Sequence, residues 1–170
     1  MRLTHFMSAA ALVVCSTTAV QAETWRMATA YPEANFHTQN IQQFVNEIKE
    51  ATNGQLDITV HANGSLIRPG EIKNAVRSRQ VETGEFLISA LANENPIFAV
   101  DAIPFLAVSH DDSEKLYEIT KPYLEEILGR QNMKLLYSVA WPPQGMYTDR
   151  PIGSIEDLKG LRTRAYSPQT

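Results

Sequence analysis

The sequence predicts an α/β fold, in which helices flank a parallel or mixed β-sheet, and three observations support this prediction. Of the 170 residues, 44% are hydrophobic and 20% are charged, a balance typical of globular proteins with a buried core. Segments with strand-like alternation of apolar residues are followed by segments with helical spacing. Turn residues such as Asn53-Gly54 and Pro69-Gly70 separate these segments. In such a fold the ligand crevice lies beyond the carboxyl ends of the strands.

The first 22 residues are predicted to be an export signal. They combine a positively charged start, an apolar stretch over residues 6–14 and the triplet Val20-Gln21-Ala22, which has the pattern of a cleavage site. The only cysteine, Cys15, would leave with the signal, and Val14 before it disfavours a lipid anchor there. We therefore expect a periplasmic protein cleaved after Ala22.

The first half of the mature chain is predicted to form a βαβαβ arrangement. Alternating or continuous apolar residues predict strands over residues 24–30, 56–60 and 86–92, and a short strand over 100–106 that Pro104 interrupts. Apolar residues at helical spacing predict one helix over residues 35–51 and a second one that begins at Pro69-Gly70.

A longer helix and further short strands are predicted in the second half. The helix covers residues 109–128, with Ser109 or Asp111 as its N-cap and Gly129 at its end, and Pro122 is expected to kink or split it. After it we expect strands over residues 134–140, 144–148 and 161–165, and a helical turn over 154–158.

No motif for catalysis or metal binding stands out. The four histidines are far apart, and no zinc-protease, phosphate-loop or serine-hydrolase motif occurs. The net charge of −4 provides no basic field for nucleic acid. We predict a protein that is not an enzyme and that needs neither metal nor cofactor. His37, which follows the first strand, is a candidate ligand contact; a structural role at the start of a helix is the alternative.

Two arginines near the end of the chain form the clearest candidate binding feature. In a strand, Arg162 and Arg164 would lie on one face because side chains alternate with a period of two. An arginine held on a strand can bind a carboxylate through two parallel charge-assisted hydrogen bonds. The alternative is that both arginines are solvated surface residues.

The chain resembles the substrate-binding proteins of tripartite ATP-independent periplasmic (TRAP) transporters, DctP type. The segments that carry the resemblance occur in the same order as in that family: 25–29 (WRMAT), 31–32 (YP), 51–54 (ATNG), 56–58 (LDI), 63–66 (NGSL), 101–106 (DAIPFL) and 155–164 (IEDLKGLRTR). Each is weak alone, but the ordered set is specific. The resemblance implies a two-lobed α/β receptor with mixed sheets flanked by helices, which closes about a hinge on a small organic acid and delivers it to membrane permease subunits.

The resemblance also implies a set of ligand contacts. Arg164 matches the carboxylate-binding arginine of the family. Where some members place a second arginine, this sequence has Gln144, which can hydrogen-bond but cannot pair a charge. Trp141 then indicates a ligand with a planar or apolar portion that rests on its ring. The equally favoured alternative is that Trp141 packs in the core. Further contacts are expected from Tyr31, Leu91 and Ser167.

Family members are about twice as long as this chain, so the sequence is interpreted as an N-terminal half. Residues 1–22 would be the signal, 23–140 the first lobe, and 141–170 the crossover and the start of a largely missing second lobe. Two other functions stay open: the ligand-binding domain of another transporter or sensor, and an exported enzyme whose catalytic part is missing. The sequence predicts neither the oligomeric state nor the identity of the acid.

Overall fold

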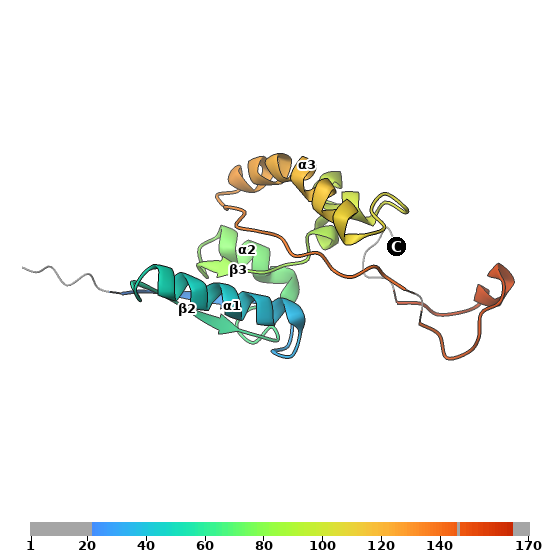
Figure 1. Ribbon diagram of the computed structural model, residues 1–170, viewed down its shortest axis with the longest axis horizontal. Helices are drawn as coiled ribbons and strands as arrows, with labels where there is room; N and C mark the ends of the chain where they lie inside the picture. The colour runs from blue at the N-terminus through green and yellow to red at the C-terminus, as the bar shows by residue number, and fades with distance from the viewer. Residues whose placement is uncertain (1–21, 146, 165–170) are drawn as a thin grey trace, which may run out of the picture.

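The computed structural model describes residues 22–145 and 147–164 (Figure 1). Its strands and helices are β1 (Glu23–Ala28), α1 (Phe36–Ala51), β2 (Leu56–His61), α2 (Ile72–Arg77), β3 (Thr83–Gly84) and α3 (His110–Gly129). The chain also contains four short 3-10 helices within the described residues: η1 (Pro69–Glu71), η2 (Ile88–Leu91), η3 (Pro96–Ala102) and η4 (Ile155–Leu158). The predicted βαβαβ order of the first half is confirmed.

The sheet is parallel, and β1 is its central strand. β1 pairs with β2 on one side, with Trp25 opposite Ile58, and with β3 on the other, with Met27 opposite Thr83. In the order β2-β1-β3, the chain leaves β1 to one side and later returns to its other side. This reversal creates a switch point between β1 and β3, where open α/β sheets place their ligands.

Helix α1 covers the sheet through one apolar face. Its buried Ile41 and Val45 pack against Met27 of β1 and Ile58 of β2 and form the first core. The Asn35 side chain caps the helix by accepting a hydrogen bond from the His37 N–H at 2.9 Å. The helix predicted over residues 35–51 is thus confirmed within one residue.

The third strand lies earlier in the chain than predicted, at Thr83–Gly84 rather than over residues 86–92. The Glu85 N–H donates to the Ala28 carbonyl at 2.8 Å, and β1 ends there, so later residues find no strand edge to pair with. Residues 88–91 instead form η2. Gly84 permits close packing of α2, because a Cβ atom there would lie 2.6 Å from Ile72 Cγ2.

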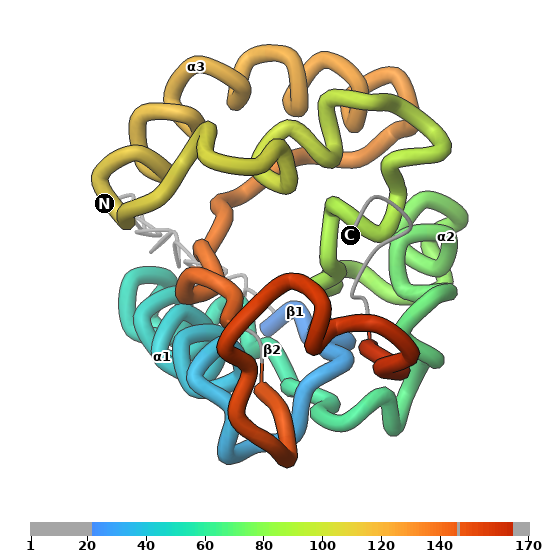
Figure 2. Tube along the Cα trace, turned by 90° about the vertical axis from the view of Figure 1, so that its right-hand side faces the viewer, coloured from blue at the N-terminus to red at the C-terminus, as the bar shows by residue number. Residues whose placement is uncertain are grey.

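The structure contains no strand at the four remaining predicted positions, within the described residues. These positions are 100–106, 134–140, 144–148 and 161–165. Residues 100–102 belong to η3, which Asn95 caps by accepting from the Ile97 N–H at 3.1 Å, and residues 103–106 form a bend and a turn. Residues 134–140 and 161–164 form no ladder, and neither do the described residues of 144–148. An apolar run becomes a strand only beside a partner that takes up its backbone hydrogen bonds. Figure 2 shows residues 134–141, in orange, running from the end of α3 toward the start of α1.

Helix α3 forms a second core with η2 and η3. Phe98, Leu124 and Leu128 are its buried members. The predicted N-cap is confirmed, because Ser109 Oγ accepts from the Asp112 N–H at 3.1 Å. Pro122 does not split the helix, which continues to Gly129 as predicted. No helix in residues 22–145 and 147–164 is both long and apolar enough to cross a membrane.

Glu82 and Arg26 form an ion pair, and from it we predict how the stability of the folded state depends on pH. The Glu82 carboxylate accepts from Arg26 Nε at 3.1 Å and from the Arg26 backbone N–H at 2.8 Å. These bonds lower the pKa of Glu82 from 4.5 to about 2. Because the folded pKa is depressed, this stabilisation is complete above pH 4.5 and is lost as the pH falls toward 2.

We expect Glu82→Gln to lower the melting temperature at pH 7. Between pH 4.5 and 2.5 the melting temperature of the variant should fall less than that of the wild type. Thermal unfolding followed by circular dichroism at a series of pH values measures this. Glu50→Gln, at an exposed position on α1, serves as the control. Identical pH profiles of Glu82→Gln and the wild type would contradict the assignment.

Candidate functional site

Polar side chains follow β1 and β3 where the two strands end at the switch point. Thr29 comes directly after β1, and Glu85 comes directly after β3. Thr29 Oγ1 donates a hydrogen bond to Glu85 Oε2 at 2.5 Å, and the Tyr31 N–H donates to Thr29 Oγ1 at 3.2 Å. The sheet thus builds a polar base at the edge where an α/β protein binds its ligand.

Four rings gather beside this base, and we call them the aromatic cluster: Tyr31, Phe36, His37 and Trp141. The His37 ring centroid lies 4.3 Å from that of Trp141 and 5.4 Å from that of Tyr31, which stacks on it at an interplanar angle of 27°. Phe36 lies 4.2 Å from His37 and 5.3 Å from Trp141. The start of α1 positions Phe36 and His37, while Trp141 arrives from the segment after α3.

His37 is the most buried member of the cluster, with 3% of its surface exposed. Neither ring nitrogen has a hydrogen-bond partner in the described chain, and Nδ1 lies 3.5 Å from Glu85 Oε1. Burial lowers the pKa of His37. Burial also raises the pKa of Glu85, against the lowering effect of the Thr29 hydrogen bond. The imidazole is therefore neutral at pH 7 and keeps one unused donor and one unused acceptor.

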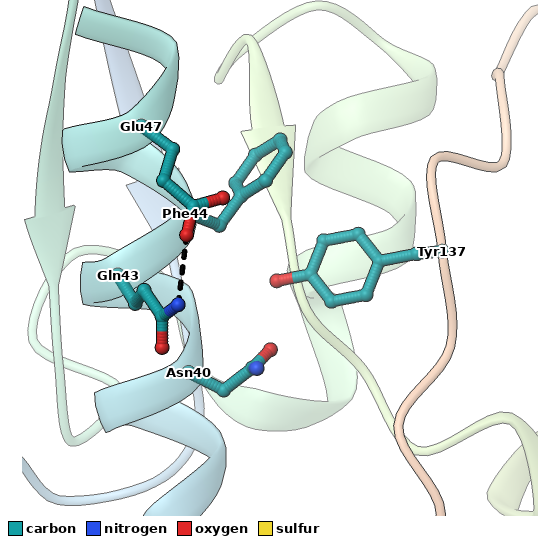
Figure 3. Close-up of a pocket in the computed structure, with 5 residues that line it drawn as sticks. All are labelled: Asn40, Gln43, Phe44, Glu47 and Tyr137. Carbon is teal, nitrogen blue, oxygen red and sulfur yellow. Dashed lines mark hydrogen bonds between the residues drawn. The ribbon is translucent and has the colours of Figure 1, made fainter. Parts of the chain in front are cut away.

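A shallow pocket of about 200 Å³ lies along α1, and no member of the aromatic cluster lines it. It is lined by Asn40, Gln43, Phe44, Glu47 and Tyr137 (Figure 3). The Tyr137 hydroxyl points toward α1, and the Tyr137 ring lies 5.1 Å from that of Phe44. Burial and the negative charges of Glu85 and Glu47 raise the pKa of Tyr137, so its hydroxyl remains a hydrogen-bond donor at neutral pH.

The structure brings three of the seven predicted contact residues together. Tyr31, His37 and Trp141 form most of the aromatic cluster. Leu91 packs instead against the second core. Gln144 and Arg164 are exposed and are not part of the aromatic cluster, and Ser167 lies outside the described residues.

Sequence reasoning missed Thr29, Phe36 and Glu85. A signal for two of them was available, because a polar residue directly after a parallel strand stands at the ligand edge of the sheet. Thr29 fell inside the predicted first strand, and Glu85 fell just before the misplaced third strand. A strand ending at Gly84 would have put Glu85 at that edge. Phe36 had no comparable signal.

The arrangement suits binding. Aromatic faces offer a surface for a flat or apolar ligand portion, and the carboxylate and imidazole edges offer hydrogen bonds in a partly buried place. No group of three or more His, Cys, Asp or Glu residues within residues 22–145 and 147–164 is arranged to hold a metal ion.

A parallel sheet with aromatic and polar side chains at its switch point is the arrangement in which α/β proteins bind ligands. Residues 27–170 match the DctP family, the bacterial extracellular solute-binding proteins of family 7, and the chain belongs to this family. The resemblance noted from the sequence is thereby confirmed.

Solved structures of related receptors have the same fold. The chain is 49% identical to DctP6, a Bordetella pertussis extracytoplasmic solute receptor binding pyroglutamic acid, with a TM-score of 0.84 over 87% of this chain and 49% of that one. It is 39% identical to a marine metagenome TRAP solute-binding protein specific for pyroglutamate, with a TM-score of 0.84 over 88% of this chain and 49% of that one.

Curated relatives are more distant in sequence. A solute-binding protein of Chromohalobacter salexigens is 25% identical over 156 residues, which are 90% of this chain and 46% of the relative. A monocarboxylate 2-oxoacid-binding periplasmic protein of Nostoc is 27% identical over 164 residues, which cover 91% of this chain and 45% of the relative. The chain thus spans about half the length of the curated relatives it matches.

Proposed function

We propose that the chain forms the N-terminal half of a periplasmic TRAP receptor that captures a small organic acid and delivers it to membrane permease subunits. The observation that carries this proposal is the aromatic cluster on its polar base at the switch point, in a chain of the DctP family. Export by residues 1–22, with cleavage after Ala22, belongs to the same proposal.

The proposed mechanism is capture without a chemical reaction. Residues 23–140 form the first lobe, and residues 141–170 form the crossover and the start of the second. The aromatic cluster holds one portion of the acid, and Arg164 binds its carboxylate once the lobes close. Because the aromatic cluster belongs mainly to the first lobe and Arg164 to the start of the second, only a ligand that contacts both can favour closure.

Pyroglutamate is the first ligand to test. Two solved receptors that bind this acid are 49% and 39% identical to the chain, and both TM-scores are 0.84. A pyroglutamate ring is small and nearly flat, which suits the aromatic cluster, and it carries a single carboxylate, which suits one arginine.

We expect pyroglutamate to raise the melting temperature of the protein encoded by the native gene, purified without residues 1–22. At a hundred times its dissociation constant, a ligand stabilises the folded state by about 2.7 kcal/mol. Differential scanning fluorimetry with pyroglutamate, 2-oxo acids and sugar acids measures the effect. 2-Pyrrolidinone, which has the same ring without a carboxylate, is the control and should leave the melting temperature unchanged. A protein that no acid stabilises would contradict the proposal.

A further inference from the structure

We propose that Glu85 is a specificity-determining residue that accepts a hydrogen bond from an N–H or O–H group of the ligand, and that it excludes acids with a second carboxylate at this position. The proposal rests on the proposed receptor function and adds the chemical class of its ligand. That class is a monocarboxylic acid with a separate hydrogen-bond donor, such as a lactam acid.

Glu85 has acceptor capacity that the described chain leaves unused. Its Oε2 accepts from Thr29 Oγ1, and this bond fixes the carboxylate at the switch point between β1 and β3. Its Oε1 accepts no hydrogen bond from the described residues and lies 3.5 Å from His37 Nδ1. A carboxylate offers about four acceptor positions, so a ligand donor can bind this oxygen without displacing Thr29.

The neighbouring imidazole also lacks hydrogen bonds. His37 is buried, and neither of its nitrogens is paired within the described chain. Buried polar groups in native proteins are normally paired, so an unpaired buried ring beside a half-used carboxylate points to a polar ligand group. An amide edge, which carries both an N–H and a carbonyl, could satisfy Glu85 and His37 together.

The charge around Glu85 excludes a second ligand carboxylate. No lysine or arginine of the described residues forms an ion pair with Glu85, whose side chain keeps 19% of its surface exposed. Two carboxylates close together in such a partly buried place repel each other, because neither charge is screened well. The single carboxylate of the ligand must therefore bind a group other than Glu85, which is the role proposed for Arg164.

The aromatic cluster also restricts the shape of the ligand. Tyr31 and Trp141 pack edge to face beside His37, with ring centroids 5.2 Å apart and an interplanar angle of 74°. Such an arrangement offers an apolar wall next to the acceptor. A compact ring with one N–H on its edge matches both features.

The decisive comparison uses the unmodified protein encoded by the native gene, without residues 1–22, and three acids. These are pyroglutamate, its lactone analogue 5-oxotetrahydrofuran-2-carboxylate, in which a ring oxygen replaces the N–H, and glutarate, which has a second carboxylate. We expect titration calorimetry to show lactone binding weaker than lactam binding by about 100-fold or more, since a site built for a donor rejects an analogue that lacks it. Glutarate should not bind measurably.

Glu85→Gln tests the assignment to this residue. The neutral amide keeps the size of the side chain and can also donate, so the preference for lactam over lactone should fall below about 10-fold and glutarate should gain affinity. Glu50→Gln is the matched control, because Glu50 is exposed near the end of α1 and does not line the candidate site. It should leave the preference unchanged.

Three results would overturn the proposal. Equal binding of lactam and lactone by the unmodified protein would refute it and leave the receptor function intact. An unchanged preference in a folded Glu85→Gln variant would refute the role of this residue. Binding of none of these acids, nor of any 2-oxo or sugar acid, would refute the proposed function itself and this proposal with it. If Glu85→Gln does not fold, the lactam and lactone comparison still decides.

Discussion

Arg164→Ala is expected to abolish measurable binding of the organic acid. A guanidinium group that binds a carboxylate bidentately forms charge-assisted hydrogen bonds, and truncating one partner of such a desolvated pair costs about 2–5 kcal/mol or more. A loss of that size lowers affinity by a factor of about 30 to several thousand. Titration calorimetry on the native gene product, with the ligand found by fluorimetry, measures it.

Two further variants make this prediction specific. Arg164→Lys keeps the charge but loses the planar fork, so we expect an intermediate affinity. Arg162→Ala removes an arginine two positions away that does not match the family position, and binding should stay within about threefold of the wild type. If Arg164→Ala were still stabilised by the ligand as strongly as the wild type, Arg164 would not be the carboxylate-binding residue.

Phe98→Ala is expected to destabilise the fold by about 3–5 kcal/mol. The Phe98 side chain is fully buried, with 0% of its surface exposed, and packs with Leu124 and Leu128 of α3. Removing the ring leaves a cavity that rigid neighbours fill only in part. Urea unfolding followed by circular dichroism at 222 nm measures the change in the free energy of unfolding.

Phe105 offers a matched control a few residues along the chain. Its side chain is 93% exposed, so Phe105→Ala should change the free energy of unfolding by no more than about 0.5 kcal/mol. Similar losses in the two variants would contradict the second core as described, since only Phe98 lies inside it.

Part of the candidate site could be predicted from the sequence. Tyr31 and His37 follow the first predicted strand, where a parallel α/β sheet presents its binding loops, and Trp141 belongs to a motif that breaks an apolar run. The structure places all three in one cluster. Glu85 is not among the predicted contacts, because the strand before it is predicted too late in the chain, and its position depends on which residues pair with the far edge of β1.

The sequence by itself determined the helices and the alternating α/β plan. Helices α1 and α3 form from local signals, namely helical spacing of apolar residues and the N-caps Asn35 and Ser109, and these signals act within a few residues. The tertiary structure alone decided which apolar runs become strands. Residues 83–84 pair with β1 whereas 134–140 find no partner, because a strand is stabilised by hydrogen bonds to residues far away in the chain. The same long-range pairing brings Glu85 to Thr29 and His37, and so creates the polar base of the site.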